Sequence, residues 1–413
     1  MIFLFLLFVL YLSQLFIISP GMIKHGDLAL AQSNDLIAGL SSSSLACILI
    51  IIYSFSKIIF FRNTKVLKFD AFLLFFILLF FSVGFAAGIE RIPFSSAINY
   101  SIKLLMPFII FFYMVYSFKI EDINKLYTTI LLINIMLIVQ VLLCQFLIGS
   151  FSANRFYWYM TKEEYYGFYN SPHPFAALLG LLSLWNIKSL LMKKWITTNL
   201  LLLFFNFLLI VLSGVRTYLV AFVFSVVLIY CYSFVIKNRF KYLSIILFFV
   251  FVSFLLIFFE HFKEIFFSTR IGSILDSSKV LSGRDIRWFE DFLYYLNSYD
   301  IFEKIFGRGF GSVYLINNEI FNTYINSLNG ILDLLLDHGI FGALLLIFLY
   351  ISVLVRCQPR SESGWFFWIF VFYLFLGFMV NNILPYVTIM PLAIIFLAVY
   401  KFEVDNINIY SKV

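Results

Sequence analysis

Long apolar segments alternate with short polar ones along almost the whole chain. Residues 71–85, 200–212 and 243–259 are nearly continuous apolar runs. With their flanks they approach or exceed the roughly 20 residues that cross about 30 Å of hydrocarbon as a helix. The pattern predicts helices at residues 1–19, 36–61, 71–89, 97–118, 126–148, 172–187, 196–214, 217–236, 242–260, 331–355, 365–381 and 385–400. We therefore expect an all-α polytopic membrane protein with about twelve spans.

The composition changes this picture little. Hydrophobic residues make up 63% of the 413 residues and charged residues 12%, which exceeds the roughly half apolar usage of soluble domains. Residues 1–19 lack a positively charged leading segment and lie far from the small-residue triplet at 29–31, so we expect an uncleaved first helix. No repeat or low-complexity linker separates a second domain, which favours one membrane domain over residues 1–413.

Lysine and arginine gather in alternate short loops between the predicted helices. These residues are Arg62, Lys65, Lys68, Lys119, Lys125, Lys188, Lys193, Lys194, Lys237, Arg239, Lys241, Arg356, Arg360 and Lys401. The positive-inside rule places such loops, and with them both termini, in the cytoplasm. Residues 149–171 and the large loop at 261–330 are then external. The net charge of +7 follows from this topology and predicts no nucleic-acid partner.

The segment from residue 281 to 342 is the one long polar interruption, so most groups for polar chemistry must come from it. Ser282 can cap a helix whose first turn contains Asp285. The helix would have an apolar side and a polar, aromatic side: Ile286, Phe289, Leu293 and Leu296 against Arg284, Arg287, Trp288, Asp291 and Tyr295. Two guanidinium groups beside an aromatic ring suit a phosphorylated glycan. An interfacial helix with an Arg287–Asp291 pair at i, i+4 spacing explains the same residues.

Two further features lie in this segment. The turn GRGFGS at residues 307–312 carries one cation, Arg308. Either its backbone approaches a ligand, or it is a bend that returns the chain to the membrane.

The predicted helix that enters the bilayer has four polar residues on one side at helical spacing: Asn326, Asn329, Asp333 and Asp337. Acids at that depth tend to face a polar cavity, so Asp333 is a candidate proton acceptor. Solvation among the lipid headgroups is the alternative. His338 lies on the opposite side from Asn329, and we expect it to be structural.

Two external segments earlier in the chain also contain candidate groups. Arg216 lies in SGVRTY between two apolar runs, where it either clamps a lipid-borne phosphate or extends to the headgroups. The loop before residue 172 combines Arg155 with aromatic and charged residues and ends in SPHPFA, which contains His173. This mixture fits a sugar-binding loop and equally an aromatic belt at the membrane surface.

Taken in order, these motifs resemble the O-antigen polymerase and O-antigen ligase superfamily. They are SPHPFA, SGVRTY, SGR with a tryptophan four residues after its arginine, GRGFGS, and N-G-x-L-x-x-L-x-x-x-G-x-x-G from Asn329 onward. The resemblance implies transfer of a glycan from an undecaprenyl diphosphate carrier on the periplasmic face of a bacterial inner membrane, without metal, cofactor or nucleotide. It assigns the family's two arginines to Arg216 and Arg284. The family's His-Asn pair is Leu328-Asn329 here, so the resemblance assigns no general base.

These inferences combine into one predicted mechanism. Arg216 and Arg284, helped by Arg287, bind the donor diphosphate, and a sugar hydroxyl attacks the anomeric carbon with Asp333 or Asp291 as the base. The further substrate contacts we expect are Trp288, Arg308, Asn329, His173 and Arg155. We expect a polymerase of lipid-linked repeat units, and the resemblance implies a chain-length regulator and a flippase as partners. A ligase that acts on the lipid A core, a transporter or flippase of lipid-linked sugar, and a non-catalytic assembly partner are the alternatives.

Overall fold

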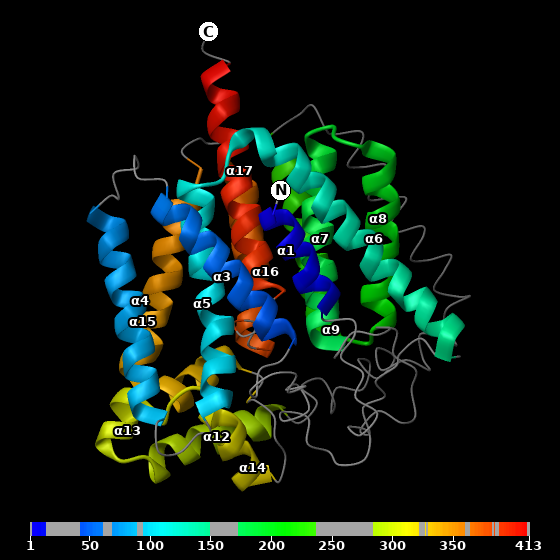
Figure 1. Ribbon diagram of the computed structural model, residues 1–413. Coiled ribbons are helices and arrows are strands. Elements are labelled where there is room, and N and C mark those ends of the chain that lie inside the picture. Colours follow the sequence, from blue (N-terminus) through cyan, green and yellow to red (C-terminus); the bar gives the residue numbers. More distant parts are fainter. Residues whose placement is uncertain are drawn as a thin grey trace, which may run out of the picture. The chain divides into compact units, whose positions relative to one another are not determined.

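The computed structural model describes residues 2–13, 42–60, 68–88, 94–148, 172–236, 284–321, 327, 329–359, 364–381, 384 and 388–410. Every regular element in these ranges is a helix, as the sequence predicts (Figure 1). The helices form two compact units. The first comprises Met1–Ile133, Gly283–Gly364 and Phe378–Val413, and the second comprises Asn134–Ser282 and Trp365–Gly377.

Five of the described helices are long and apolar enough to cross a membrane, which supports a membrane-embedded protein. They are Asp70–Gly88 within α4 (Lys68–Gly88), Ala97–Tyr116 within α5 (Phe94–Tyr116), Ile123–Leu147 within α6 (Ile123–Ile148), α7 (Pro172–Leu191) and α15 (Gly330–Cys357). Shorter apolar segments also fall at predicted places, within α1 (Ile2–Ser13), α3 (Ser42–Phe60), α8 (Ile196–Leu212), α9 (Arg216–Ile236) and α16 (Trp365–Asn381). The predicted helix at 242–260, the loop at 149–171 and the first part of the large loop lie outside the described residues. The count of twelve spans and the sidedness of the loops stay predictions.

Helix α5 is largely buried within the first unit. It packs against α3, α4 and α17 (Met390–Tyr410), and its residues 104, 106 and 108–114 are buried. A helix that is apolar on all sides is stable only when other helices or lipid surround it. Because other helices surround α5 there, residues 108–114 have no polar side.

Helix α17 begins later and ends later than the predicted 385–400, since it runs from Met390 to Tyr410. Its polar extension has partners in the first unit. Lys401 Nζ donates to the Arg356 carbonyl oxygen at 2.6 Å, and the Tyr127 hydroxyl donates to Glu403 Oε1 at 2.9 Å. The end of the apolar run is therefore not the end of the helix.

Three short helices lie across one end of α4, α5 and α15 in the first unit (Figure 1). They are α12 (Arg284–Ser298), α13 (Ile301–Phe306) and α14 (Ser312–Phe321), and we call them the short-helix layer. The buried residues that join them to α15 are Tyr295, Tyr299, Val313, Ile316 and Leu336. The layer is thus a packed part of the first unit, built from the polar stretch on which the sequence concentrates its chemistry.

In the second unit, α7 packs against α8 and α9. Tyr373 from α16 donates its hydroxyl to the Ala177 carbonyl oxygen of α7 at 2.8 Å. The two helices approach so closely that a Cβ added at Gly180 would overlap the Tyr373 side chain. The turn predicted between α8 and α9 is present, with Gly214 at φ 72°.

Candidate functional site

The glycine-rich turn at residues 307–312 binds to a break in α15. Gly339 has φ 61° and ψ −172°, which is not a helical conformation, so the carbonyl groups before it are available to other donors. The Arg308 N–H donates to the Leu336 oxygen at 3.3 Å, and the Gly309 N–H donates to the Asp337 oxygen at 2.8 Å. The backbone of this turn therefore pairs with the protein's own helix.

Phe310, at the tip of the turn, is completely buried in the first unit. Its ring centroid lies 5.1 Å from Phe85 and 5.5 Å from Phe81, both on α4, and 4.8 Å from His338 on α15. Such offset and edge contacts are favourable aromatic geometries. The turn is an anchor for the short-helix layer, which agrees with a bend that returns to the membrane helices. His338 is buried among these rings, as expected of a structural residue.

Asp337 caps α14. Its Oδ1 accepts hydrogen bonds from the Val313 N–H at 2.8 Å and the Ser312 hydroxyl at 3.0 Å, while its Oδ2 accepts from the Gly311 N–H at 3.1 Å. A carboxylate at this point satisfies N–H groups that have no partner within the helix and also favours the helix dipole. Asp337 thus has a structural role that its predicted place on a polar helix face did not suggest.

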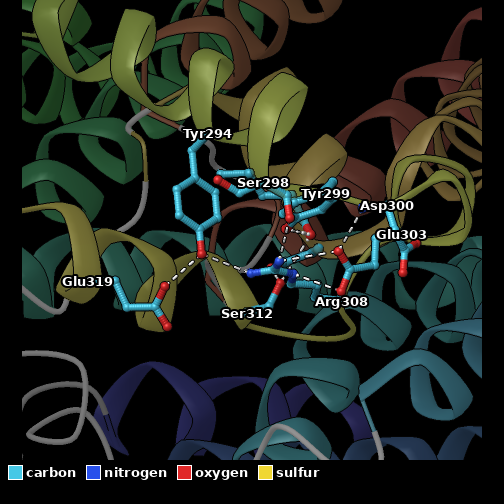
Figure 2. A network of polar contacts seen from close by, with 10 residues as sticks. Tyr294, Ser298, Tyr299, Asp300, Glu303, Arg308, Ser312 and Glu319 are labelled. Carbon is cyan, nitrogen blue, oxygen red and sulfur yellow. Dashed lines mark hydrogen bonds and ion pairs between the residues drawn. The ribbon is translucent and has the colours of Figure 1, made fainter.

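Arg308 lies within the short-helix layer, and protein groups surround its guanidinium (Figure 2). Nε pairs with Glu303 Oε1 at 3.2 Å, one terminal nitrogen donates to the Tyr294 hydroxyl at 2.9 Å, and the other donates to the Ser298 oxygen at 3.1 Å. The guanidinium carbon also lies 4.3 Å from the centre of the Tyr299 ring. A role for Arg308 in substrate binding would require these contacts to break, so the geometry favours a structural role.

Helix α12 has the two sides that its sequence predicts. The apolar side is exposed, with exposed fractions of 63% for Ile286 and 60% for Phe289, whereas Asp291 and Tyr295 on the other side are buried. The polar side therefore faces the protein. In a membrane protein this arrangement is reasonable, because an apolar side can meet lipid while the polar side finds partners inside.

Asp291 is the most unusual group on the buried side. Neither carboxylate oxygen has a hydrogen-bond partner of normal geometry among the described residues. Burial raises the pKa of Asp291 to about 6, although the nearby Ser327 hydroxyl, the Arg287 guanidinium and the Asn317 amide favour its charged form. The guanidinium carbon of Arg287 lies 5.0 Å from the centre of the Phe321 ring. A carboxylate whose pKa lies near neutral pH, beside a cation, can accept a proton.

Ser327 connects this carboxylate to α15. Its carbonyl oxygen accepts a hydrogen bond from Trp288 Nε1 at 2.9 Å, and its N–H donates to Asp333 Oδ1 at 2.8 Å. Its hydroxyl lies close enough to Asp291 to favour the charged carboxylate. Four predicted or newly found groups therefore meet here: Trp288, Asp291, Ser327 and Asp333, which we call the Asp291 cluster. All belong to the first unit.

Asn329 stands beside this cluster but acts as the N-cap of α15. Its Oδ1 accepts from the Ile331 N–H at 3.0 Å and from the Leu332 N–H at 3.2 Å. Only the amide nitrogen of Asn329 is therefore left for the predicted contact with substrate. The sequence did not single out Ser327 or Asn317, because one serine and one asparagine in a polar stretch form no pattern before the helices pack.

The other predicted site residues lie elsewhere or beyond the described side chains. Arg284 and Arg216 are the first residues of α12 and α9, but their side chains lie outside the described part of the structure, as does all of Arg155. His173 is half-buried near the start of α7 in the second unit. Their predicted roles stay predictions.

Within the described residues, no group of three histidine, cysteine or carboxylate side chains could hold a metal ion. Comparison of the chain with models of known protein families, with curated proteins and with solved structures finds no match. The Asp291 cluster and the sequence motifs are therefore the features of the chain that indicate a function.

Proposed function

We propose that the protein is a membrane glycosyltransferase that joins undecaprenyl-diphosphate-linked repeat units on the periplasmic face of a bacterial inner membrane. One observation carries the proposal. A fully buried carboxylate, Asp291, has no hydrogen-bond partner of normal geometry in the described residues and has a pKa of about 6. Burying such a group has a cost in folding, and perturbed carboxylates of this kind concentrate at functional sites.

The residues around Asp291 supply complementary chemistry. Arg287 is one turn away on the same helix, and it provides a cation that can fork two oxygens of a diphosphate. Trp288 offers an aromatic face to a sugar, and its indole N–H is held by the Ser327 carbonyl at 2.9 Å. In this proposal, Arg284 at the beginning of α12 adds a second positive charge to the diphosphate.

The reaction follows from these roles. An acceptor sugar hydroxyl attacks the anomeric carbon of the donor, and the bond between that carbon and the diphosphate oxygen breaks. Asp291 takes the hydroxyl proton, and the carrier diphosphate leaves with the negative charge that Arg284 and Arg287 stabilise. Asp333, which accepts a hydrogen bond from the backbone of Ser327, positions the segment next to the base. Arg216 stays a separate prediction from the sequence motif.

The first test is the length of the cell-surface glycan in a strain that lacks the gene. The strain is complemented with wild type, Asp291→Asn, Arg287→Gln or Glu290→Gln, and the amount of folded protein is measured for each. Glu290 is the matched control, because it is the adjacent carboxylate and its side chain is exposed. For a polymerase, the empty strain shows lipid A core with a single repeat unit. Asp291→Asn and Arg287→Gln then fail to restore the ladder, while Glu290→Gln restores it.

The same gel distinguishes the alternatives. A strain that lacks capped core and accumulates long lipid-linked polymer identifies a ligase, in which case the acceptor in our proposal is wrong. If both Asp291→Asn and Arg287→Gln restore the full ladder at normal protein levels, the Asp291 cluster takes no part in the reaction. That result would favour a transporter or a non-catalytic partner of the assembly machinery.

A further inference from the structure

The short-helix layer exposes a large apolar surface. It is formed by one side of α12 and by α13, and its exposed side chains are Ile286, Phe289, Phe292, Leu296, Ile301, Phe302 and Ile305. Phe302 is 74% exposed and Ile301 73%. Leaving a large apolar side chain in water, compared with burying it, costs about 1.5–3 kcal/mol. Exposed apolar side chains gathered in this number mark a site that something apolar covers.

The neighbouring structure indicates what covers it. Helix α15, one of the candidate membrane spans, has its own exposed apolar stripe, formed by Ile340, Phe341, Leu344, Phe348, Ile351 and Val355. Helix α13 packs directly on α15 and also touches α4. The ring centroids of Phe306 and exposed Phe341 lie 5.8 Å apart, and a Cβ added at Gly339 would overlap the Ile305 backbone. The apolar surface of the span therefore continues onto α13.

The character of α12 agrees with the same covering. It is the most strongly amphipathic of the described helices and has little net hydrophobicity, a combination typical of helices that lie flat in a membrane interface rather than cross it. Its polar side faces the protein, where Trp288 bonds to Ser327 and the Tyr295 hydroxyl donates to the Lys304 oxygen at 2.7 Å. The apolar side is the one whose large side chains remain exposed.

We propose that α12 and α13 lie in the membrane interface, with their exposed apolar side chains immersed in the same lipid leaflet that surrounds the adjoining end of α15. The partner of this surface is lipid, and the inference does not depend on glycosyl transfer. It also means that the Asp291 cluster lies directly behind a lipid-covered helix. A lipid-borne molecule could then reach the edge of the cluster by diffusion within the leaflet.

Site-directed spin labelling in lipid nanodiscs tests this placement. The four native cysteines, Cys47, Cys144, Cys231 and Cys357, are first replaced, and the replaced protein is checked for correct folding by size-exclusion chromatography. Nitroxides are then attached to Phe289→Cys and Phe302→Cys, with Glu290→Cys and Asn297→Cys as controls. All four positions are exposed, so each accepts a label without repacking. The measurement is collision with oxygen, which concentrates in lipid, and with a water-soluble nickel complex.

We expect labels at 289 and 302 to have a ratio of oxygen to nickel collisions several-fold higher than labels at 290 and 297. Equal ratios at all four positions would show that the surface faces water and would overturn the proposal. Protection from both reagents, together with spin–spin coupling between copies, would show that a second chain covers the surface and would also overturn it. Because no activity is measured, the outcome is independent of the proposed reaction.

Discussion

Replacing Asp291 with asparagine should alter how folding stability depends on pH. The two side chains have nearly the same size, but asparagine carries no charge. In the folded protein the carboxyl group is fully buried, and burial raises its pKa from the ordinary 3.8 to about 6. Above about pH 6, the substitution therefore removes a buried negative charge that destabilises the folded protein.

The size of the effect follows from the pKa shift. The shift from 3.8 to about 6 is about 2 units, and each unit corresponds to about 1.4 kcal/mol. A carboxyl whose pKa is raised in the folded state contributes stability that is fully present below pH 4 and is lost as the pH rises through about 6. Because the unfolded carboxyl is already partly ionised at pH 4, the stability of Asp291→Asn relative to wild type should rise by roughly 2–2.5 kcal/mol between pH 4 and pH 7.

The assay is equilibrium or thermal unfolding of both proteins in the same detergent, followed across this pH range. Glu290→Gln is the control, because it removes an exposed carboxylate from the adjacent position and should leave the difference from wild type nearly independent of pH. The proposed function adds a second expectation, since Asp291→Asn should be inactive at neutral pH although it is the more stable protein there. A difference between Asp291→Asn and wild type that is constant from pH 4 to pH 7 would refute the argument.

Four other substitutions test the packing around the glycine-rich turn. Phe310→Ala removes a completely buried ring and should lower stability by about 3–5 kcal/mol. The folded peak in size-exclusion chromatography should then be lost, and a full peak would contradict the anchoring role of Phe310. Gly309→Ala should destabilise more than Gly311→Ala. Both glycines have positive φ, but a Cβ at 309 would overlap Gly88, whereas at 311 the nearest atom is 3.9 Å away; equal melting temperatures would argue against that close approach. Arg308→Lys should lower stability by about 2 kcal/mol and leave activity per folded molecule unchanged, whereas a selective rise in KM would restore its predicted role in binding.

Sequence patterns located the helices well and their partners poorly. The predicted 365–381 coincides with α16, and the predicted 172–187 begins where α7 begins. Apolar periodicity determines such elements because lipid or neighbouring helices must cover each apolar surface. Periodicity alone also separated the two sides of α12, and it correctly placed Trp288 and Asp291 on the side opposite Ile286 and Phe289.

What the sequence could not predict depends on contacts between elements. The sequence predicts a continuous helix at 331–355, but Gly339 interrupts it, and N–H groups of the glycine-rich turn bind the carbonyls that the break leaves available. That break explains why Asp337, placed by periodicity beside Asp333, instead caps α14. It also explains why Arg308 lies within the protein, since the turn folds back on its own layer.

The cap on α14 has a consequence for how the protein is made. Val313 is translated 24 residues before Asp337, whose side chain accepts its hydrogen bond. The short-helix layer is thus synthesised before α15, the span that holds the layer in place. We expect nascent chains arrested before residue 337 to leave α14 open to proteolysis, and chains arrested after α15 has emerged and inserted to protect it. A protease-resistant α14 in the shorter chains would disprove this order. If the order holds, an unfolded short-helix layer marks chains in which α15 has not yet entered the membrane, and cellular quality control can recognise such chains by it.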